Sequence, residues 1–306
     1  MRIASAVVAI VLAAVAAEGV TIAPGDVATM PVNPCCCILC PPPPQDVLAA
    51  NDGTLKQKFD GSALAFGPNG HLFVNTFAGL TEYDTSMNVV HTIHPVFSKF
   101  TIAPNGDIYT LTFSMTIAIL SPSGAVKQMF TLPNPEETFS GLQVIDVAPD
   151  QCTVFYTDAA LHGHRFNTCT GQPLADLAPG TWNALRAMSD GGYLAANGGT
   201  LSVFDANNQL LRSYVEQPWT IRALAFDADP RFVWIGVGTA SKMRLADGTI
   251  VGIVNALFSG VEEIAVNGEQ RSAAADLSTN IPALSPPLLF ALALGLTALA
   301  WQRLRM

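Results

Sequence analysis

The sequence predicts an all-β, six-bladed propeller with four-stranded blades, and two repeating segments carry this prediction. The first segment is a short apolar strand that runs into a polar turn, and it recurs at residues 62–70, 98–106, 143–150, 183–191, 222–229 and 262–268. Its matching turn positions are spaced by 36, 45, 40 and 39 residues: Pro68, Pro104, Pro149, Ser189 and Ala228. A period near 40 residues is typical of one propeller blade, and the length of 306 residues fits one such domain with tails.

The second repeating segment is a hairpin with a polar turn. Its clearest copy spans residues 201–214, and parallel copies occupy residues 83–93, 117–130, 165–177 and 242–254. Asp247-Gly248 and Ser123-Gly124 are turn dipeptides between alternating apolar positions, which is a strong local signal for a β-hairpin. One strand, one turn and one hairpin therefore make up each repeat.

A sixth hairpin, at residues 46–59, precedes the first strand segment instead of following the last one. We therefore expect residues 46–59 to supply the two outer strands of a blade whose two inner strands lie at about residues 261–277. Such a 2+2 closure joins the two ends of the propeller and leaves no blade half built.

The two ends of the chain predict export. Arg2 precedes an apolar stretch that ends in small residues at Ala16 and Ala17, which is typical of a cleaved signal peptide, with an uncleaved anchor as the alternative. The predicted organisation is a signal peptide at 1–17, a Cys/Pro-rich linker at 18–45, the propeller at 46–278 and a C-terminal tail at 279–306.

The C-terminal tail combines a short motif, an apolar run and a basic end. Residues 281–287 read Ile-Pro-Ala-Leu-Ser-Pro-Pro, the run from Leu288 to Trp301 predicts a transmembrane helix, and Arg303 and Arg305 favour a cytoplasmic C-terminus. This tail resembles the IPTL-type relatives of PEP-CTERM sorting signals. The resemblance implies an exported bacterial protein at the cell surface or outside the cell, and a sorting protease as a partner. A plain single-pass anchor is the alternative.

Charge and motif content limit the functional classes. The formal net charge is −9 and no basic block precedes the last few residues, which argues against a nucleic-acid partner. No Ser-His-Asp, HExxH, Walker or GxSxG signature is present, so we predict no catalytic residues and lean towards a protein that is not an enzyme. His162 and His164 would bind a metal only with a third ligand, and a solvated loop tip is favoured instead.

Six cysteines fall into two groups. Cys152 and Cys169 flank a predicted hairpin centred near residues 160–161, so we expect them to form a disulfide, with free thiols as the alternative. Four more thiols, at Cys35, Cys36, Cys37 and Cys40, precede a run of prolines. Disulfides within this cluster or to another chain are favoured over a metal site, and their pairing stays open.

A candidate ligand site follows from the repeats. Six positions before each turn anchor, the residues are polar: Ser62, Ser98, Gln143, Asn183, Arg222 and, in one of two alignments, Glu262. Because side chains alternate along a strand, these residues are expected at one mouth of the central channel, with Trp182 and Trp219 nearby. We predict that this mouth binds a glycan, a small polar ligand or a protein; a wet rim without a ligand is the alternative.

The alternation of apolar strands and polar hairpins over residues 46–270 resembles the NHL and SMP-30-like propeller superfamily. That resemblance implies a divalent ion such as calcium at the channel mouth and a hydrolase, lactonase or lyase activity. Hard divalent ions prefer several carboxylate and carbonyl oxygens, however, and this mouth offers Glu262 beside the cation Arg222. We therefore expect no cofactor and a binding or interaction module, with metal-dependent hydrolysis as the alternative.

Overall fold

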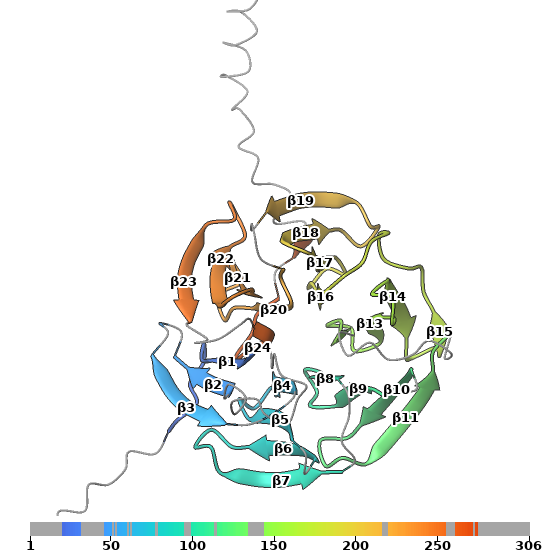
Figure 1. Ribbon diagram of the computed structural model, residues 1–306. Helices are drawn as coiled ribbons and strands as arrows, with labels where there is room; N and C mark the ends of the chain where they lie inside the picture. The colour runs from blue at the N-terminus through green and yellow to red at the C-terminus, as the bar shows by residue number, and fades with distance from the viewer. Residues whose placement is uncertain are drawn as a thin grey trace, which may run out of the picture.

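Each repeat of strand, turn and hairpin folds into one antiparallel sheet of four strands, and six such sheets are arranged in a ring around a central axis (Figure 1). The predicted all-β, six-bladed propeller is thereby confirmed. The computed structural model describes residues 20–31, 46–50, 52, 54–59, 61, 63–76, 79–94, 99–112, 115–133, 144–215, 220–254, 261–271 and 273–274.

The four strands of every blade succeed one another from the channel to the rim. The innermost strands are β4 (Ala63–Phe66), β8 (Lys99–Ile102), β12 (Ile145–Val147), β16 (Ala184–Ala187), β20 (Ala223–Phe226) and β24 (Val261–Val266). The second strands of the same six blades, in the same order, are β5 (Leu72–Thr76), β9 (Ile108–Leu111), β13 (Thr153–Thr157), β17 (Tyr193–Asn197), β21 (Phe232–Gly236) and β1 (Val27–Pro31). Their third strands are β6 (Gly79–Tyr83), β10 (Thr116–Leu120), β14 (Gly163–Asn167), β18 (Thr200–Phe204), β22 (Ala240–Arg244) and β2 (Asp46–Ala49). Their outermost strands are β7 (Val89–Ile93), β11 (Val126–Thr131), β15 (Gln172–Pro173), β19 (Leu210–Val215), β23 (Ile250–Val254) and β3 (Leu55–Phe59).

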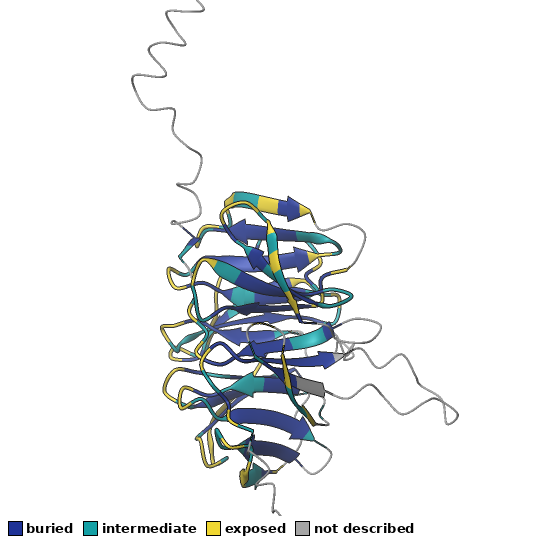
Figure 2. Ribbon diagram, turned by 90° about the vertical axis from the view of Figure 1, so that its left-hand side faces the viewer, coloured by how far each residue is buried: buried dark blue, intermediate teal, exposed yellow. Residues whose placement is uncertain are grey.

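Burial falls from the middle of each blade to its rim, which explains the apolar and polar segments of the repeat. Every residue of β9 is buried, whereas β11 at the rim of the same blade is mostly exposed. The core divides into six clusters, each between two neighbouring blades; Phe73 of one blade and Phe100 of the next share one of them. The buried strand centres and the exposed turns at their ends are visible in Figure 2.

The predicted 2+2 ring closure is wrong, because the closing blade takes one strand from the C-terminal side and three from the N-terminal side. Its order is β24-β1-β2-β3, with Val27 opposite Val266 and Thr29 opposite Ile264. The two chain segments meet where other blades have a continuous turn: the Gly25 amide donates to the Asn267 carbonyl at 2.8 Å, and the Asn267 amide donates to the Asp26 carbonyl at 2.9 Å.

The reason for this 1+3 closure is burial at the second-strand position. By the repeat, this second strand would fall at residues 272–276, which read Ser-Ala-Ala-Ala-Asp and offer less apolar surface to the space between two neighbouring blades than Val27 and Met30 do. Val27, Ala28 and Thr29 fill it instead, and all three are fully buried. This strand, β1, lies upstream of residue 46, where the repeat pattern predicts linker.

The predicted signal peptide, Cys35, Cys36, Cys37, Cys40 and the C-terminal tail with its transmembrane helix lie outside the described residues. Among the residues that the structure describes, no helix is both long and apolar enough to cross a membrane.

Candidate functional site

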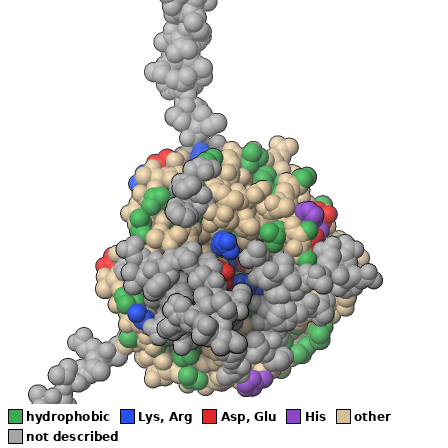
Figure 3. Space-filling view, viewed as in Figure 1, with side chains coloured by type: hydrophobic (Ala, Val, Ile, Leu, Met, Phe, Trp, Pro, Cys, Tyr) green, Lys and Arg blue, Asp and Glu red, His purple; other side chains and the backbone are tan. Residues whose placement is uncertain are grey.

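The central channel contains a cavity of about 440 Å³ that is lined from all six blades. Its walls come from the innermost strands β4, β8, β16, β20 and β24 and from the start of β12. Cavities of roughly 300–1,000 Å³ hold most small-molecule ligands, so this volume is enough for one. Figure 3 shows basic and acidic side chains together at the centre of the propeller face, where the channel opens.

Three of the predicted mouth residues line this cavity: Asn183, Arg222 and Glu262. They precede or begin the innermost strands of three consecutive blades, β16, β20 and β24. Val266 lies opposite Val27 as Phe66 lies opposite Leu72, so counting back along β24 places Glu262 level with residue 62. The register between β24 and β1 shifts at this point, where Glu263 faces Met30 and Val261 faces Pro31. Ser62, Ser98, Gln143 and Trp219 lie outside the described residues.

Trp182 does not belong to the mouth, contrary to the prediction. Its side chain is only 5% exposed and packs edge-on against Phe204, with the ring centroids 5.7 Å apart. Its indole Nε1 donates to the Ala178 carbonyl at 3.2 Å. Trp182 precedes β16, and its ring packs with Leu177 and Leu185 in the hydrophobic cluster between two blades. Trp182 is therefore not available to stack on a glycan.

An ion pair that the sequence did not indicate crosses the channel. Lys99 of β8 pairs with Glu263 of β24, and the other oxygen of Glu263 accepts a hydrogen bond from the Leu64 amide of β4 at 3.0 Å. One carboxylate thus connects three innermost strands. Lys99 and Glu263 occupy one repeat position that is apolar in the other four blades, so the repeat pattern gives no signal for them.

A second, larger group of charges surrounds Asp146, which is fully buried on β12. Its Oδ1 accepts from Arg271 Nη2 at 2.8 Å and lies 3.7 Å from Arg186 Nη1, while its Oδ2 accepts from the Ala187 amide at 2.7 Å. Arg186 also pairs with Glu269. Burial alone would raise the pKa of Asp146, but Arg186 and Arg271 outweigh it and hold the pKa below its ordinary value.

The segment after β24 spans the channel at the end opposite the predicted mouth. Arg271 donates to the carbonyl oxygens of Val147 at 2.7 Å and Ala187 at 3.1 Å, which end the innermost strands β12 and β16. The Gln270 amide donates to the Asp227 carbonyl at 2.9 Å, and Ala274 is fully buried beside β16 and β20. This segment occurs once in the chain, so the repeat pattern could not reveal it.

The charges that remain open are at the mouth. Within the part of the chain that the structure describes, the side chains of Arg222 and Glu262 form no ion pair or hydrogen bond, whereas the other charged residues of the cavity are paired. The buried Nε of Arg186 also has no acceptor among those residues. Arg222 is exposed and Glu262 is half-buried, so both are accessible to a ligand.

His164, one of the two histidines considered as metal ligands from the sequence, is hydrogen-bonded to carboxylates. Its Nδ1 lies 2.8 Å from Asp176, its Nε2 lies 3.2 Å from Asp158, and its ring stacks on Tyr156 with centroids 5.2 Å apart. Burial would lower the pKa of His164, but the hydrogen bonds to Asp176 and Asp158 outweigh it and raise the pKa above 6.5. The described residues contain no group of three or more His, Cys, Asp and Glu side chains that could hold a metal ion.

The raised pKa of His164 makes stability depend on pH. The stabilisation is complete below the unfolded-state pKa of about 6.5 and is lost as pH rises through the higher folded-state pKa. Replacing His164 by glutamine should therefore reduce the free energy of unfolding by about 1 kcal/mol more at about pH 5 than at about pH 9. Urea unfolding of both proteins at the two pH values measures this difference. An equal reduction at both values would contradict it.

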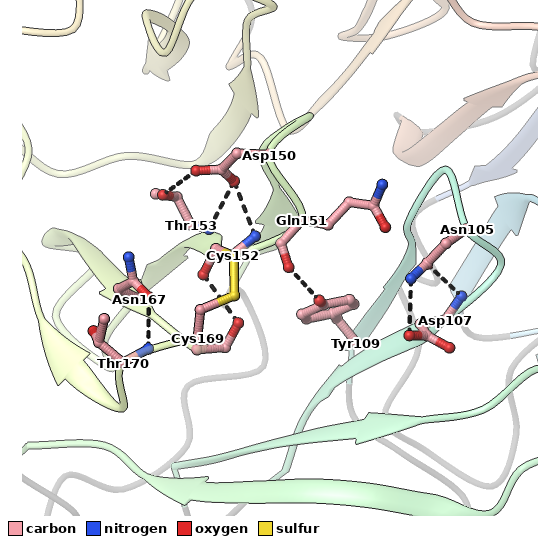
Figure 4. The surroundings of a disulfide bond; sticks show 11 residues. Asn105, Asp107, Tyr109, Asp150, Gln151, Cys152, Thr153, Asn167, Cys169 and Thr170 are labelled. Atoms are coloured by element: carbon pink, nitrogen blue, oxygen red, sulfur yellow. Dashed lines mark hydrogen bonds between the residues drawn. A yellow bond between two sulfur atoms is a disulfide. The ribbon is translucent and has the colours of Figure 1, made fainter.

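The predicted disulfide between Cys152 and Cys169 is confirmed, with Cα atoms 5.2 Å apart (Figure 4). Its register differs from the prediction by one residue. Thr153 lies opposite Asn167, and the Thr168 amide donates to the Cys152 carbonyl at 2.8 Å, so Thr168 faces Cys152 directly. The bridge therefore joins diagonal positions just beyond the strand ends.

Comparisons with known proteins support the fold alone. Neither a family model nor a curated protein matches the sequence. Among solved structures, a protein of unknown function from Bacteroides caccae is similar, with a TM-score of 0.59 and 13% sequence identity; the match covers 79% of this chain and 98% of that one. At this identity the likeness carries no information on ligand or activity.

Proposed function

We propose that this chain is an exported propeller, held at the cell surface by its C-terminal tail, that binds a small polar ligand at the mouth of its channel. Among the described residues, two charged side chains without partners, Arg222 and Glu262, lie at the mouth of a cavity whose other charges are paired. This observation carries the proposal. Charged groups in a cavity are normally satisfied by partners, so an open cation and an open anion favour a ligand that satisfies them.

Export, the membrane helix at Leu288 to Trp301 and processing by a sorting protease are proposed from the sequence alone. The apolar N-terminal stretch and the tail at residues 281–306 support them. A glycan or a protein partner remains within the proposal, but the burial of Trp182 removes one of the two aromatic platforms that favour a glycan.

A metal-dependent hydrolase of the SMP-30-like kind is the competing proposal, and the pairing of the cavity carboxylates argues against it. Glu263 is engaged by Lys99 and Glu269 by Arg186, which leaves Glu262 as the open carboxylate among the described lining residues. A calcium ion takes six to eight oxygen ligands, several of them usually carboxylates. One equivalent of a divalent metal in the purified chain, lost in Glu262→Gln, would reverse this preference.

The binding proposal is tested by a thermal-shift screen of the full-length chain against sugars, sugar acids, amino acids and short peptides. A ligand present at about 100 times its dissociation constant stabilises the folded state by about 2.7 kcal/mol, which is readily measured. Thr220 is exposed and lines the cavity, so Thr220→Trp should obstruct the mouth and abolish the shift.

Thr170→Trp is the matched control, because Thr170 is exposed at a turn and does not line the cavity. It should retain the ligand-induced shift. The proposal fails if no compound shifts the melting temperature, or if Thr220→Trp responds as the wild type does.

A further inference from the structure

We infer that the ligand of the channel mouth is a zwitterion, namely an amino acid or short peptide with apolar side chains. Its carboxylate would bind Arg222 and its ammonium group would bind Glu262. This inference rests on the proposed function and specifies the chemical class of the ligand.

The charge balance of the cavity supports a ligand with both charges. Lys99 is neutralised by Glu263, and Arg186 and Arg271 are neutralised by Glu269 and Asp146, which leaves one cation and one anion at the mouth. A purely anionic ligand bound to Arg222 would also meet Glu262, whose like charge repels it, and a purely cationic ligand would meet Arg222. A zwitterion satisfies both groups, because each of its charges meets an opposite one.

Further hydrogen-bond donors lie on the carboxylate side of this arrangement. Asn183 precedes β16, the blade next to that of Arg222, and its Oδ1 accepts from the Gly198 amide at 3.0 Å. That bond fixes the amide group and leaves its Nδ2, which forms no hydrogen bond within the described residues, to donate elsewhere. Carboxylate and peptide carbonyl oxygens are the acceptors that such donors require.

The rest of the cavity favours an apolar side chain. Phe66, Ile102 and Val144 line it and are only half-buried, so they present apolar surface to the channel. Burying a leucine side chain against such surface is favourable by the hydrophobic effect. A neutral sugar would use neither this surface nor the opposed charges.

Isothermal titration of the full-length chain with leucyl-leucine tests the inference. N-acetyl-leucyl-leucine lacks the ammonium group and leucyl-leucinamide lacks the carboxylate, so each should bind about 10- to 100-fold more weakly than the free dipeptide. Glu262→Gln should lose the preference for the free amino terminus, and Arg222→Gln should lose the preference for the free carboxylate. Arg231→Gln is the matched control, because Arg231 is an exposed arginine that does not line the cavity.

The outcomes separate this inference from the proposed function. Equal binding of the free and capped dipeptides overturns the zwitterion. So does the absence of dipeptide binding where a sugar or sugar acid binds and is blocked by Thr220→Trp, and that result retains the proposed function. Dipeptide binding that Thr220→Trp leaves unchanged overturns both, because the site would then lie outside the channel mouth.

Discussion

Replacing Asp146 by asparagine is expected to lower the free energy of unfolding by about 3–5 kcal/mol, the typical effect of breaking a buried ion pair. Asp146 is fully buried and accepts hydrogen bonds from Arg271 and the Ala187 amide, with Arg186 close by. Without its charge, two guanidinium groups would share only the carboxylate of Glu269. Unfolding of the full-length wild type and variant in guanidinium chloride, near neutral pH, measures this loss of stability.

Asp247→Asn is the matched control, because Asp247 pairs with Arg244 at 3.0 Å on the exposed rim. Exposed pairs contribute about 0–1 kcal/mol, so this variant should remain close to the wild type. Because the folded-state pKa of Asp146 is lowered, its contribution is present above the unfolded-state pKa of about 3.9 and is lost as pH falls through the folded value. A loss below about 1 kcal/mol at neutral pH would show that the network is not structural.

Removing the disulfide, with Cys152→Ser and Cys169→Ser together, should lower the free energy of unfolding by about 3 kcal/mol. The two cysteines are 17 residues apart, and a crosslink of this span restricts the unfolded chain. The turn around them should keep its shape, since Asp150 accepts from the Cys152 and Thr153 amides and Tyr109 donates to the Gln151 carbonyl at 2.6 Å. Thermal unfolding under oxidising conditions gives the difference.

A reducing agent supplies the control for the disulfide. It should lower the stability of the wild type to that of the double variant, and any further effect on the double variant would report on Cys35, Cys36, Cys37 and Cys40. Equal stability of the oxidised wild type and the variant would contradict the expected contribution.

The sequence was sufficient for the features that the blades share. The apolar strand segment and the hairpin recur along the chain, and they predicted the six blades. The same repeat position identified Asn183, Arg222 and Glu262, which line one cavity. Features that occur only once in the chain could not be predicted from the repeats. β1 stands apart from the repeats in the sequence, so the closing blade was divided wrongly between the two ends.

The remaining differences between the sequence-based predictions and the structure arise from tertiary contacts. Trp182 is adjacent to a mouth residue in the chain, yet its ring packs in the hydrophobic cluster between two blades. Arg271 reaches Asp146 from 125 residues away, a contact that no local pattern indicates. The diagonal placement of Cys169 arises from the hairpin register, which counting residues fixed only to within one position.

Amide hydrogen exchange of the full-length chain, with and without a ligand that raises its melting temperature, tests the central claim most directly. Binding at the channel mouth predicts slower exchange around Asn183, Arg222 and Glu262, on three neighbouring blades, and little change in the outermost strands β7, β11 and β23. Slower exchange confined to the outer strands, with the three mouth segments unchanged, would contradict the assignment of the channel as the binding site.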